Sequence, residues 1–123
     1  MDKNKDGAFC ELLAAAELVK KGFRVYFPHQ AYAKEDDIVA VNGITGNVYR
    51  VQVKSKKDKQ KWSGLLFKGI KEKAHASWFF VLYERCTGNF SVVPSKDLSA
   101  MDADKNGFAD EKGKYLGKWD LLK

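Results

Sequence analysis

Three polar side chains with the chemistry of a hydrolytic site lie on two neighbouring β-type segments. Asp37 is near the start of the run DDIVAVN, and Gln52 and Lys54 lie in the run NVYRVQVKS. Carboxylate and amide oxygens are hard ligands that hold Mg²⁺, and a lysine can orient or deprotonate an attacking water. The combination suits hydrolysis of a phosphodiester bond. An acid at a strand start, a cross-strand amide and a surface lysine are also ordinary residues, and that interpretation stays open.

The pairing of the two segments decides whether these side chains meet. Gly43 and Gly46 lie between the runs, which is typical of a hairpin connection. If Asn42 lies opposite Asn47, then Asp37 falls opposite Gln52. We therefore expect the acid and the amide to be cross-strand neighbours.

Alternation of side chains along a strand then separates two faces of the predicted hairpin. Asp37, Gln52 and Lys54 share one face. The other face is apolar and takes Ile38, Tyr49, Val51 and Val53. A slip of one residue would put Asp36 in the place of Asp37, but it would separate the polar and apolar faces less cleanly.

Glu11 is a fourth candidate, on a helix predicted over residues 7–21. Its neighbours one turn away are Gly7, Ala8, Ala14 and Ala15, so it has no basic partner at helical spacing. A carboxylate among small side chains can approach the sheet closely, where it could join a metal site. The alternative is that Glu11 simply faces solvent.

The elements that must position these residues are predicted from periodicity and turn residues. The first helix ends at Gly22, and a strand over residues 23–27 follows it. The stripe of this helix that we expect to face the core is Phe9, Leu12, Leu13, Ala16 and Val19.

Downstream of the hairpin, a basic loop over residues 56–64 leads to a short helix over about residues 65–76. The run SWFFVLYE is apolar enough for a central strand that is covered on both faces. The run FSVVP continues the sheet, and Ser95 can cap a helix that ends near Met101. The apolar residues of the tail are expected to pack on the core: Tyr115, Leu116, Trp119, Leu121 and Leu122. This order predicts one α/β domain over residues 1–123, with a central mixed sheet flanked by helices.

The charge of the chain is concentrated in one segment. The net charge is +6, but residues 50–73 contain nine basic and two acidic residues and so carry +7. Such a segment favours contact with a polyanion, most commonly nucleic acid, although a lysine-rich loop kept for solubility is an equal alternative. The candidate nucleic-acid contacts are Ser55, Lys56, Lys57, Lys59, Lys61, Trp62 and Lys68.

Several other functional classes are disfavoured by the sequence. Cys10 and Cys86 form no metal or disulfide motif, so we expect a reducing, cytoplasmic setting. The runs DKNKDG and DADKNG imitate the start of a calcium loop, but the twelfth positions are Leu13 and Gly113 instead of glutamate. No apolar run is long enough for a membrane span.

Four motifs, in this order, resemble the PD-(D/E)xK nuclease superfamily. They are Gly7-x-x-x-Glu11 on the first helix, Gly22-Phe23-x-Val25 on the first strand, Asp37-Ile38-Val39 on the second and Val51-Gln52-Val53-Lys54 on the third. Within the superfamily, the chain looks closest to small archaeal-type Holliday-junction resolvases and related stand-alone endonuclease domains. The resemblance is strongest over residues 7–54.

The resemblance implies a restriction-endonuclease-like core of helix, three strands, helix and strand. It also implies a Mg²⁺ site, with Mn²⁺ as a substitute, in which Asp37 is the principal ligand. Gln52, the Val53 carbonyl and Glu11 complete that site, and Lys54 lies beside the attacking water. The chain departs from the family pattern in two ways: Glu35-Asp36 precede Asp37 where a Pro-Asp signature is usual, and Gln52 replaces an acid.

The leading hypothesis from the sequence is a homodimeric DNA endonuclease that cleaves four-way junctions, with no membrane partner and no small-molecule cofactor. A second hypothesis keeps the chemistry but makes the enzyme a nickase or restriction-like endonuclease. A third is a non-catalytic nucleic-acid-binding module that retains the fold, and Gln52 is the residue that favours it.

Overall fold

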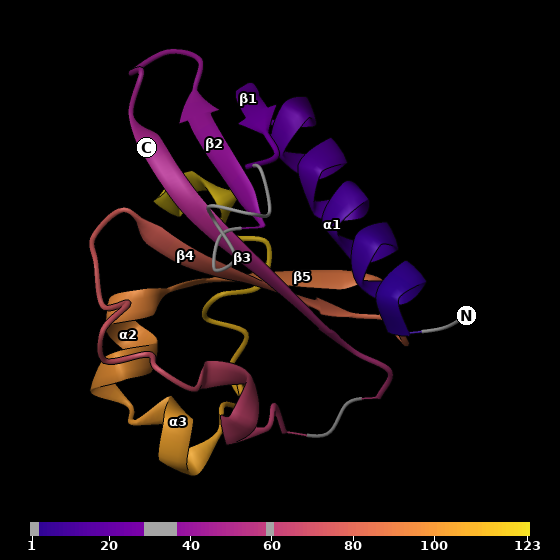
Figure 1. Cartoon of the computed structure of the whole chain (residues 1–123), viewed down its shortest axis with the longest axis vertical. Helices are drawn as coiled ribbons and strands as arrows, with labels where there is room; N and C mark the ends of the chain where they lie inside the picture. Colours follow the sequence, from indigo (N-terminus) through magenta and orange to yellow (C-terminus); the bar gives the residue numbers. More distant parts are fainter. Residues whose placement is uncertain (1–2, 29–36, 59–60) are drawn as a thin grey trace.

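The strands of the chain form one sheet, and helices pack on both of its faces (Figure 1). The structure is a computed structural model that describes residues 3–28, 37–58 and 61–123. Its first half contains helix α1 (Lys3–Lys20) and strands β1 (Phe23–Tyr26), β2 (Ile38–Asn42) and β3 (Val48–Lys56). The second half contains the 3₁₀ helix η1 (Gly64–Phe67), strands β4 (Trp78–Glu84) and β5 (Asn89–Pro94), helices α2 (Ser95–Ala100) and α3 (Ala103–Asn106), and the 3₁₀ helix η2 (Trp119–Leu121).

The sheet has the order β1-β2-β3-β4-β5 and is mixed, as the sequence predicts. Strands β3 and β4 are parallel, and the other neighbouring strands are antiparallel. Strand β4 lies inside the sheet, and its residues from Trp78 to Leu82 are all buried. The expectation of a central strand covered on both faces is confirmed.

The hairpin of β2 and β3 has the predicted register. Ile38 pairs with Val51 and Ala40 pairs with Tyr49, and the Asn42 N–H donates to the Asn47 carbonyl at 2.9 Å. The turn between them contains Gly46 at φ +75°, a left-handed conformation that costs glycine little. The register, continued by one residue, places Asp37 opposite Gln52, and Asp36 lies outside the described residues.

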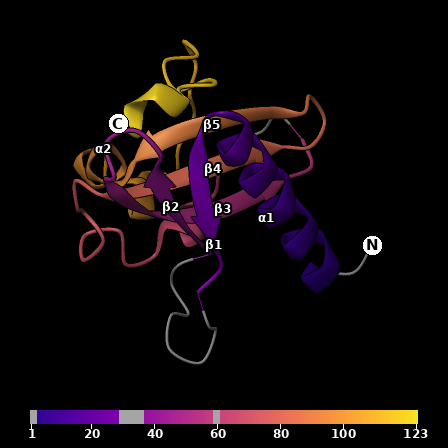
Figure 2. The same ribbon diagram turned by 90° about the horizontal axis from the view of Figure 1, so that it is seen from above.

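Helices cover the two faces of the sheet unequally (Figure 2). One face, which we name the α1 face, packs Cys10, Ala14 and Leu18 of α1 against side chains that include Ile38 and Val51. The other, named the α2 face, carries a second core built from η1, α2, α3 and the tail over β4 and β5. Because side chains alternate, Val51 and Val53 lie on the α1 face, whereas Gln52 and Lys54 lie on the α2 face.

The predicted core stripe of α1 is wrong. Phe9, Leu12 and Val19 are 48%, 59% and 58% exposed, and Ala16 is exposed as well. The buried stripe is instead Cys10, Ala14, Ala15 and Leu18. Small side chains let the helix backbone approach the sheet closely. The stripe with these residues therefore packs on the sheet in place of the stripe with bulkier side chains. The larger apolar residues of α1 are left on the surface.

The helix predicted over residues 65–76 is also not formed as such. Only η1 is helical there, and turns continue to Lys73. Gly69 adopts φ +79°, which ends the helical run. Ser95 begins α2 without capping it, because its buried hydroxyl exchanges hydrogen bonds with the His75 backbone.

The tail packs against the core in part, as expected. Tyr115, Trp119 and Leu122 are buried, whereas Leu116 and Leu121 are 48% and 39% exposed. No helix among the described residues is both long and apolar enough to cross a membrane.

Candidate active site

Asp37 lies directly before β2 and is fixed by the backbone of β3. Its carboxylate Oδ2 accepts a hydrogen bond from the Val53 N–H at 2.7 Å. Strand β2 begins only at Ile38, so Val53 lies beyond the last pair of the β2–β3 ladder. The Asp37 carboxylate therefore takes the place of a backbone acceptor at the end of that ladder.

The carbonyl of Val53 faces the same side as this N–H. The backbone groups of Arg50 and Lys56 bond toward β4, through the Ser77 carbonyl and the Arg85 N–H. The N–H and C=O groups of one residue point to the same neighbouring strand, and those of the next residue point to the opposite one. Since Arg50 and Lys56 point toward β4, both groups of Val53 point toward β2. Two oxygens, one charged and one neutral, are thus directed to the same end of β2.

Glu11 reaches Asp37 from helix α1. It lies on the same side of α1 as the buried residues Ala14, Ala15 and Leu18, and its own side chain is half-buried. Burial raises the pKa of the Glu11 carboxyl, and the charge of Asp37 and a hydrogen bond with it raise that pKa further. Two carboxyl groups therefore lie close together, which is one of the two positions that the sequence left open for Glu11. Such a pair is stabilised by a proton or by a cation.

Gln52 is buried, with 9% of its surface exposed, on the α2 face next to Asp37. Its Oε1 accepts a hydrogen bond from the Lys73 ammonium at 3.4 Å. This contact was not expected from sequence patterns, because Lys73 comes from the connection between η1 and β4. The amide oxygen predicted as a metal ligand therefore has a cationic neighbour from the protein.

Lys54 lies two residues after Gln52 on the same face and is half-buried. It pairs in register with Leu82 of β4 and is diagonal to the Asp37 position across the hairpin. Such diagonal neighbours are within reach of a long side chain. Asp37, Gln52 and Lys54 consequently lie at one end of the β2–β3 pair, and Glu11 reaches Asp37 from α1.

The fold is shared with a known nuclease structure. It matches the solved structure titled "The structure of a bacterial homing endonuclease: I-Ssp6803I", with a TM-score of 0.62 and 17% sequence identity. The match covers 99% of this chain and 93% of that one. A scan against protein-family models and a search of curated protein sequences both give no match. The likeness at this identity establishes the common fold.

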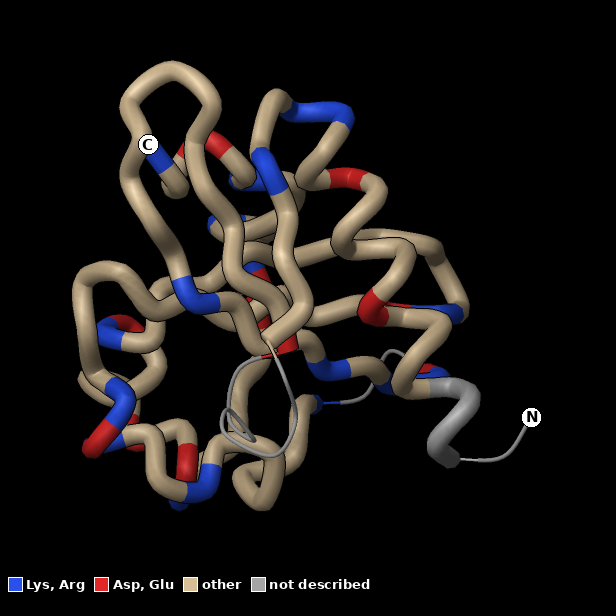
Figure 3. The backbone as a smooth tube through the Cα atoms, turned by 45° about the horizontal axis from the view of Figure 1, so that its top comes forward, with Lys and Arg blue, Asp and Glu red and all other residues tan. Residues whose placement is uncertain are grey.

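The predicted nucleic-acid contacts do not form one strip. Ser55 points to the α1 face and Lys56 to the α2 face, because they are consecutive residues of β3. Lys57, Lys61 and Lys68 are exposed, and Lys59 lies outside the described residues. Figure 3 shows basic and acidic positions scattered over the backbone.

Trp62, a candidate nucleic-acid contact of the basic loop, lies in the core of the α2 face. Trp62 is only 6% exposed, and its backbone exchanges hydrogen bonds with Phe108. The Lys56 ammonium lies 4.6 Å from the centroid of its ring. Packing in the α2-face core therefore accounts for Trp62 without a ligand.

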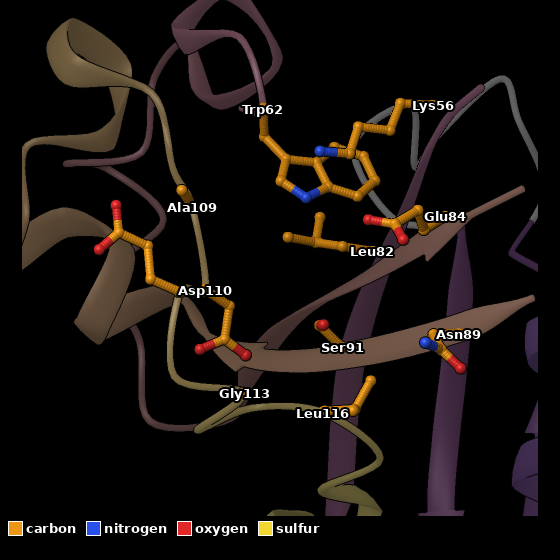
Figure 4. A pocket seen from close by; sticks show the side chains of 11 residues that line it. Lys56, Trp62, Leu82, Glu84, Asn89, Ser91, Ala109, Asp110, Gly113 and Leu116 are labelled. Carbon is orange, nitrogen blue, oxygen red and sulfur yellow. The ribbon is translucent and has the colours of Figure 1, made fainter. Parts of the chain in front are cut away.

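Lys56 and Trp62 line a pocket of about 310 Å³ over β4 and β5, apart from the Glu11–Asp37 pair (Figure 4). The acidic side chains of this pocket include Glu84 and Asp110. Asp110 already accepts hydrogen bonds from the backbone N–H groups of Lys114 and Tyr115, both at 2.9 Å. Asp110 is thus used to fold the tail.

Two basic residues beside the candidate site were missed as contacts in the sequence analysis. Arg50 precedes Gln52 by two residues on the α2 face, and Lys73 contacts Gln52 directly. The period-two alternation of Arg50, Gln52 and Lys54 was a usable signal. No sequence signal pointed to Lys73, because its position depends on turns that the sequence pattern did not reveal.

Proposed function

We propose that this protein is a metal-dependent DNA endonuclease. The observation that carries the proposal is the pairing of Glu11 with Asp37 at the end of β2, beside Gln52 and Lys54. The four residues have the order and elements of the PD-(D/E)xK pattern. The shared fold with a protein described as a homing endonuclease supports the same reading.

The residues present fit a hard divalent cation such as Mg²⁺. Glu11 and Asp37 repel each other when both are ionised, so a cation between them stabilises the ionised pair. The Val53 carbonyl offers a further, neutral oxygen ligand. Among the described residues, no three of the His, Cys, Asp and Glu side chains gather into a metal cluster, so the site depends on two acids and neutral oxygens. When bound, the cation supplies charge neutralisation at the scissile phosphate and a more acidic water.

The protein side chains have separate parts in the proposed reaction. Asp37 is held in place by the Val53 N–H, and Glu11 supplies a second carboxyl group beside it. Lys54 orients the attacking water and stabilises the charge that grows on the phosphate. Attack in line with the leaving oxygen breaks the bond to the 3′ oxygen and leaves a 5′-phosphate and a 3′-hydroxyl.

The substrate that we propose is branched DNA, most specifically the four-way junction, cleaved by a homodimer. The resemblance to small Holliday-junction resolvases supports both points. The exposed apolar stripe of α1, defined by Phe9, Leu12, Ala16 and Val19, supports the second copy, because such a stripe on a surface helix marks an interaction site. A twofold pairing of two α1 helices would cover it.

The proposal is tested with purified protein, Mg²⁺ and three substrates in parallel: linear duplex, supercoiled plasmid and a four-way junction. We expect junction cleavage that stops in EDTA. Asp37→Asn and Lys54→Ala should each lower the rate by at least about a hundredfold while DNA binding persists. Asp36→Asn is the matched control and should remain active. An inactive wild type that still binds DNA would sink the enzyme proposal.

One observation favours a second candidate, a DNA-binding module without catalysis. Gln52 carries no charge, and the Lys73 ammonium already contacts its oxygen. A cationic neighbour at that oxygen weakens a metal site by repulsion. The same three-substrate assay separates the candidates, because only the nuclease makes Mg²⁺-dependent product.

A further inference from the structure

A basic pocket lies beside the candidate active site on the α2 face. It has a volume of about 390 Å³ and is lined by Arg50, Lys68, Gly69, Glu72, Lys73 and Trp78. Arg50 precedes Gln52 by two residues of β3, a separation of about 7 Å along the strand. The pocket is therefore one or two nucleotides from Gln52 on the scale of a DNA strand.

Trp78 forms a platform in this pocket. The Arg50 guanidinium carbon lies 3.9 Å from the centroid of the indole ring, and the Lys73 ammonium lies 5.8 Å from it. These cation–π contacts direct both long side chains toward one location. Trp78 is 4% exposed, and its indole Nε1–H has no acceptor within the described part of the chain.

The lining charges favour an anion. Three cations face one carboxylate, Glu72, so the pocket carries a net positive charge. The indole donor adds a further group that an oxygen acceptor would satisfy. Lys71 is not part of this set, because it binds Asp102 of the α2–α3 connection at 2.6 Å. That ion pair joins the segment between η1 and β4 to the connection between α2 and α3.

The pocket is accessible to a large ligand. Val39 of β2 pairs with Arg50, and Tyr26 of β1 pairs with Val39, so these side chains continue the α2 face away from Trp78. Tyr26 is 53% exposed. Among the described residues, α2 packs against β4 and β5, and Arg50, Val39 and Tyr26 lie on the neighbouring strands of the same face.

We propose that this pocket binds a backbone phosphate of the DNA next to the scissile one. The inference rests on the proposed function and adds Arg50 and Lys73 as substrate-contacting residues. Lys73 links the two sites, because its ammonium contacts both the Trp78 ring and Gln52 Oε1. Capture of a phosphate by Lys73 draws the ammonium away from Gln52 and frees that oxygen for the active site.

The test compares Arg50→Gln with Lys20→Gln, which removes one exposed charge from α1 on the other face. Binding of a labelled four-way junction is measured in EDTA over a salt series, where no cleavage occurs. We expect Arg50→Gln to weaken binding about tenfold and to lower the salt slope by about 0.9, the value for one phosphate contact. Lys20→Gln should match the wild type. Arg50→Lys should restore most of the salt slope, because it retains the charge.

Equal affinity and salt slope in Arg50→Gln and wild type would overturn the proposal. A second arm titrates inorganic phosphate while tryptophan fluorescence is recorded. If phosphate binds the wild type but not Arg50→Gln, and DNA affinity is the same in both, the pocket serves a free anion and the proposal is wrong. A wild type that does not cleave DNA, with the Arg50 effect on binding intact, would instead overturn only the proposed catalysis.

Discussion

At the scale of single residues, the Glu11–Asp37 pair predicts how stability depends on pH. The pKa of Glu11 is raised above its ordinary value of 4.5 in the folded protein, first by burial and then by Asp37. The native state therefore holds its proton more tightly than the unfolded chain does. Stability without metal falls as the pH rises from 4.5 through the folded pKa.

Glu11→Gln should remove this loss. We expect the variant to be more stable than the wild type at pH 7 in EDTA and equal to it at pH 4, by urea denaturation at each pH. Mg²⁺ should stabilise the wild type at pH 7 and have a smaller effect on the variant. If Glu11→Gln were more stable than the wild type by the same amount at both pH values, ionisation of Glu11 would not be the cause of the difference.

Gln52 gives a second prediction at this scale. Gln52→Glu places a carboxylate beside the Lys73 ammonium and the Asp37 carboxylate, and it restores the usual acid of the family pattern. We expect cleavage to persist and to need about tenfold less Mg²⁺, since an added anionic ligand strengthens the metal site by an amount typical of a charged contact. Gln52→Leu, with similar bulk and no oxygen, is the control and should need more Mg²⁺. A higher Mg²⁺ requirement in Gln52→Glu would mean that Lys73 neutralises the new charge.

At the scale of elements, close packing of α1 on the sheet is what brings Glu11 to Asp37. Ala14 is fully buried one turn after Glu11, whereas Ala16 on the same helix is exposed. Ala14→Leu should cost about 1–3 kcal/mol by overpacking and should also lower cleavage, because the helix must move away from the sheet. Ala16→Leu is the matched control for stability, and cleavage is compared with the wild type. Urea unfolding and junction cleavage measure the two effects, and equal stability of the two variants would refute the close-packing account.

The same helix illustrates what sequence patterns can predict. The β2–β3 register followed from alternation and glycines, since a slip would have separated the polar and apolar faces less cleanly. The lack of basic partners around Glu11 left two directions open, the sheet or solvent, and the fold brings Glu11 to Asp37. Periodicity alone could not tell which stripe of α1 meets the core, because Phe9 and Val19 are as apolar as any core residue.

Contacts between distant segments were beyond sequence patterns for a different reason. Lys73 reaches Gln52, and Trp62 reaches Phe108, through turns that Gly69 and the tail determine. These positions depend on how non-local segments fold together. Spacing along the chain contains no information about them.

At the scale of the whole molecule, the exposed stripe of α1 predicts association of two copies. Leu12 is 59% exposed near the middle of this stripe, so Leu12→Asp should leave the monomer folded while placing a charge in the interface. We expect the wild type to have the mass of a dimer and Leu12→Asp that of a monomer by light scattering, at micromolar concentration. Cleavage of both strands of a junction should become uncoupled in the variant.

Leu65→Asp is the matched control for this experiment. Leu65 is 86% exposed in η1, away from α1, and the same change of charge there should leave the dimer intact. If both variants keep the wild-type mass, α1 is not the interface. A monomeric wild type that still cleaves both strands of a junction would contradict the proposed homodimer itself, because a single active site must then act twice on one substrate.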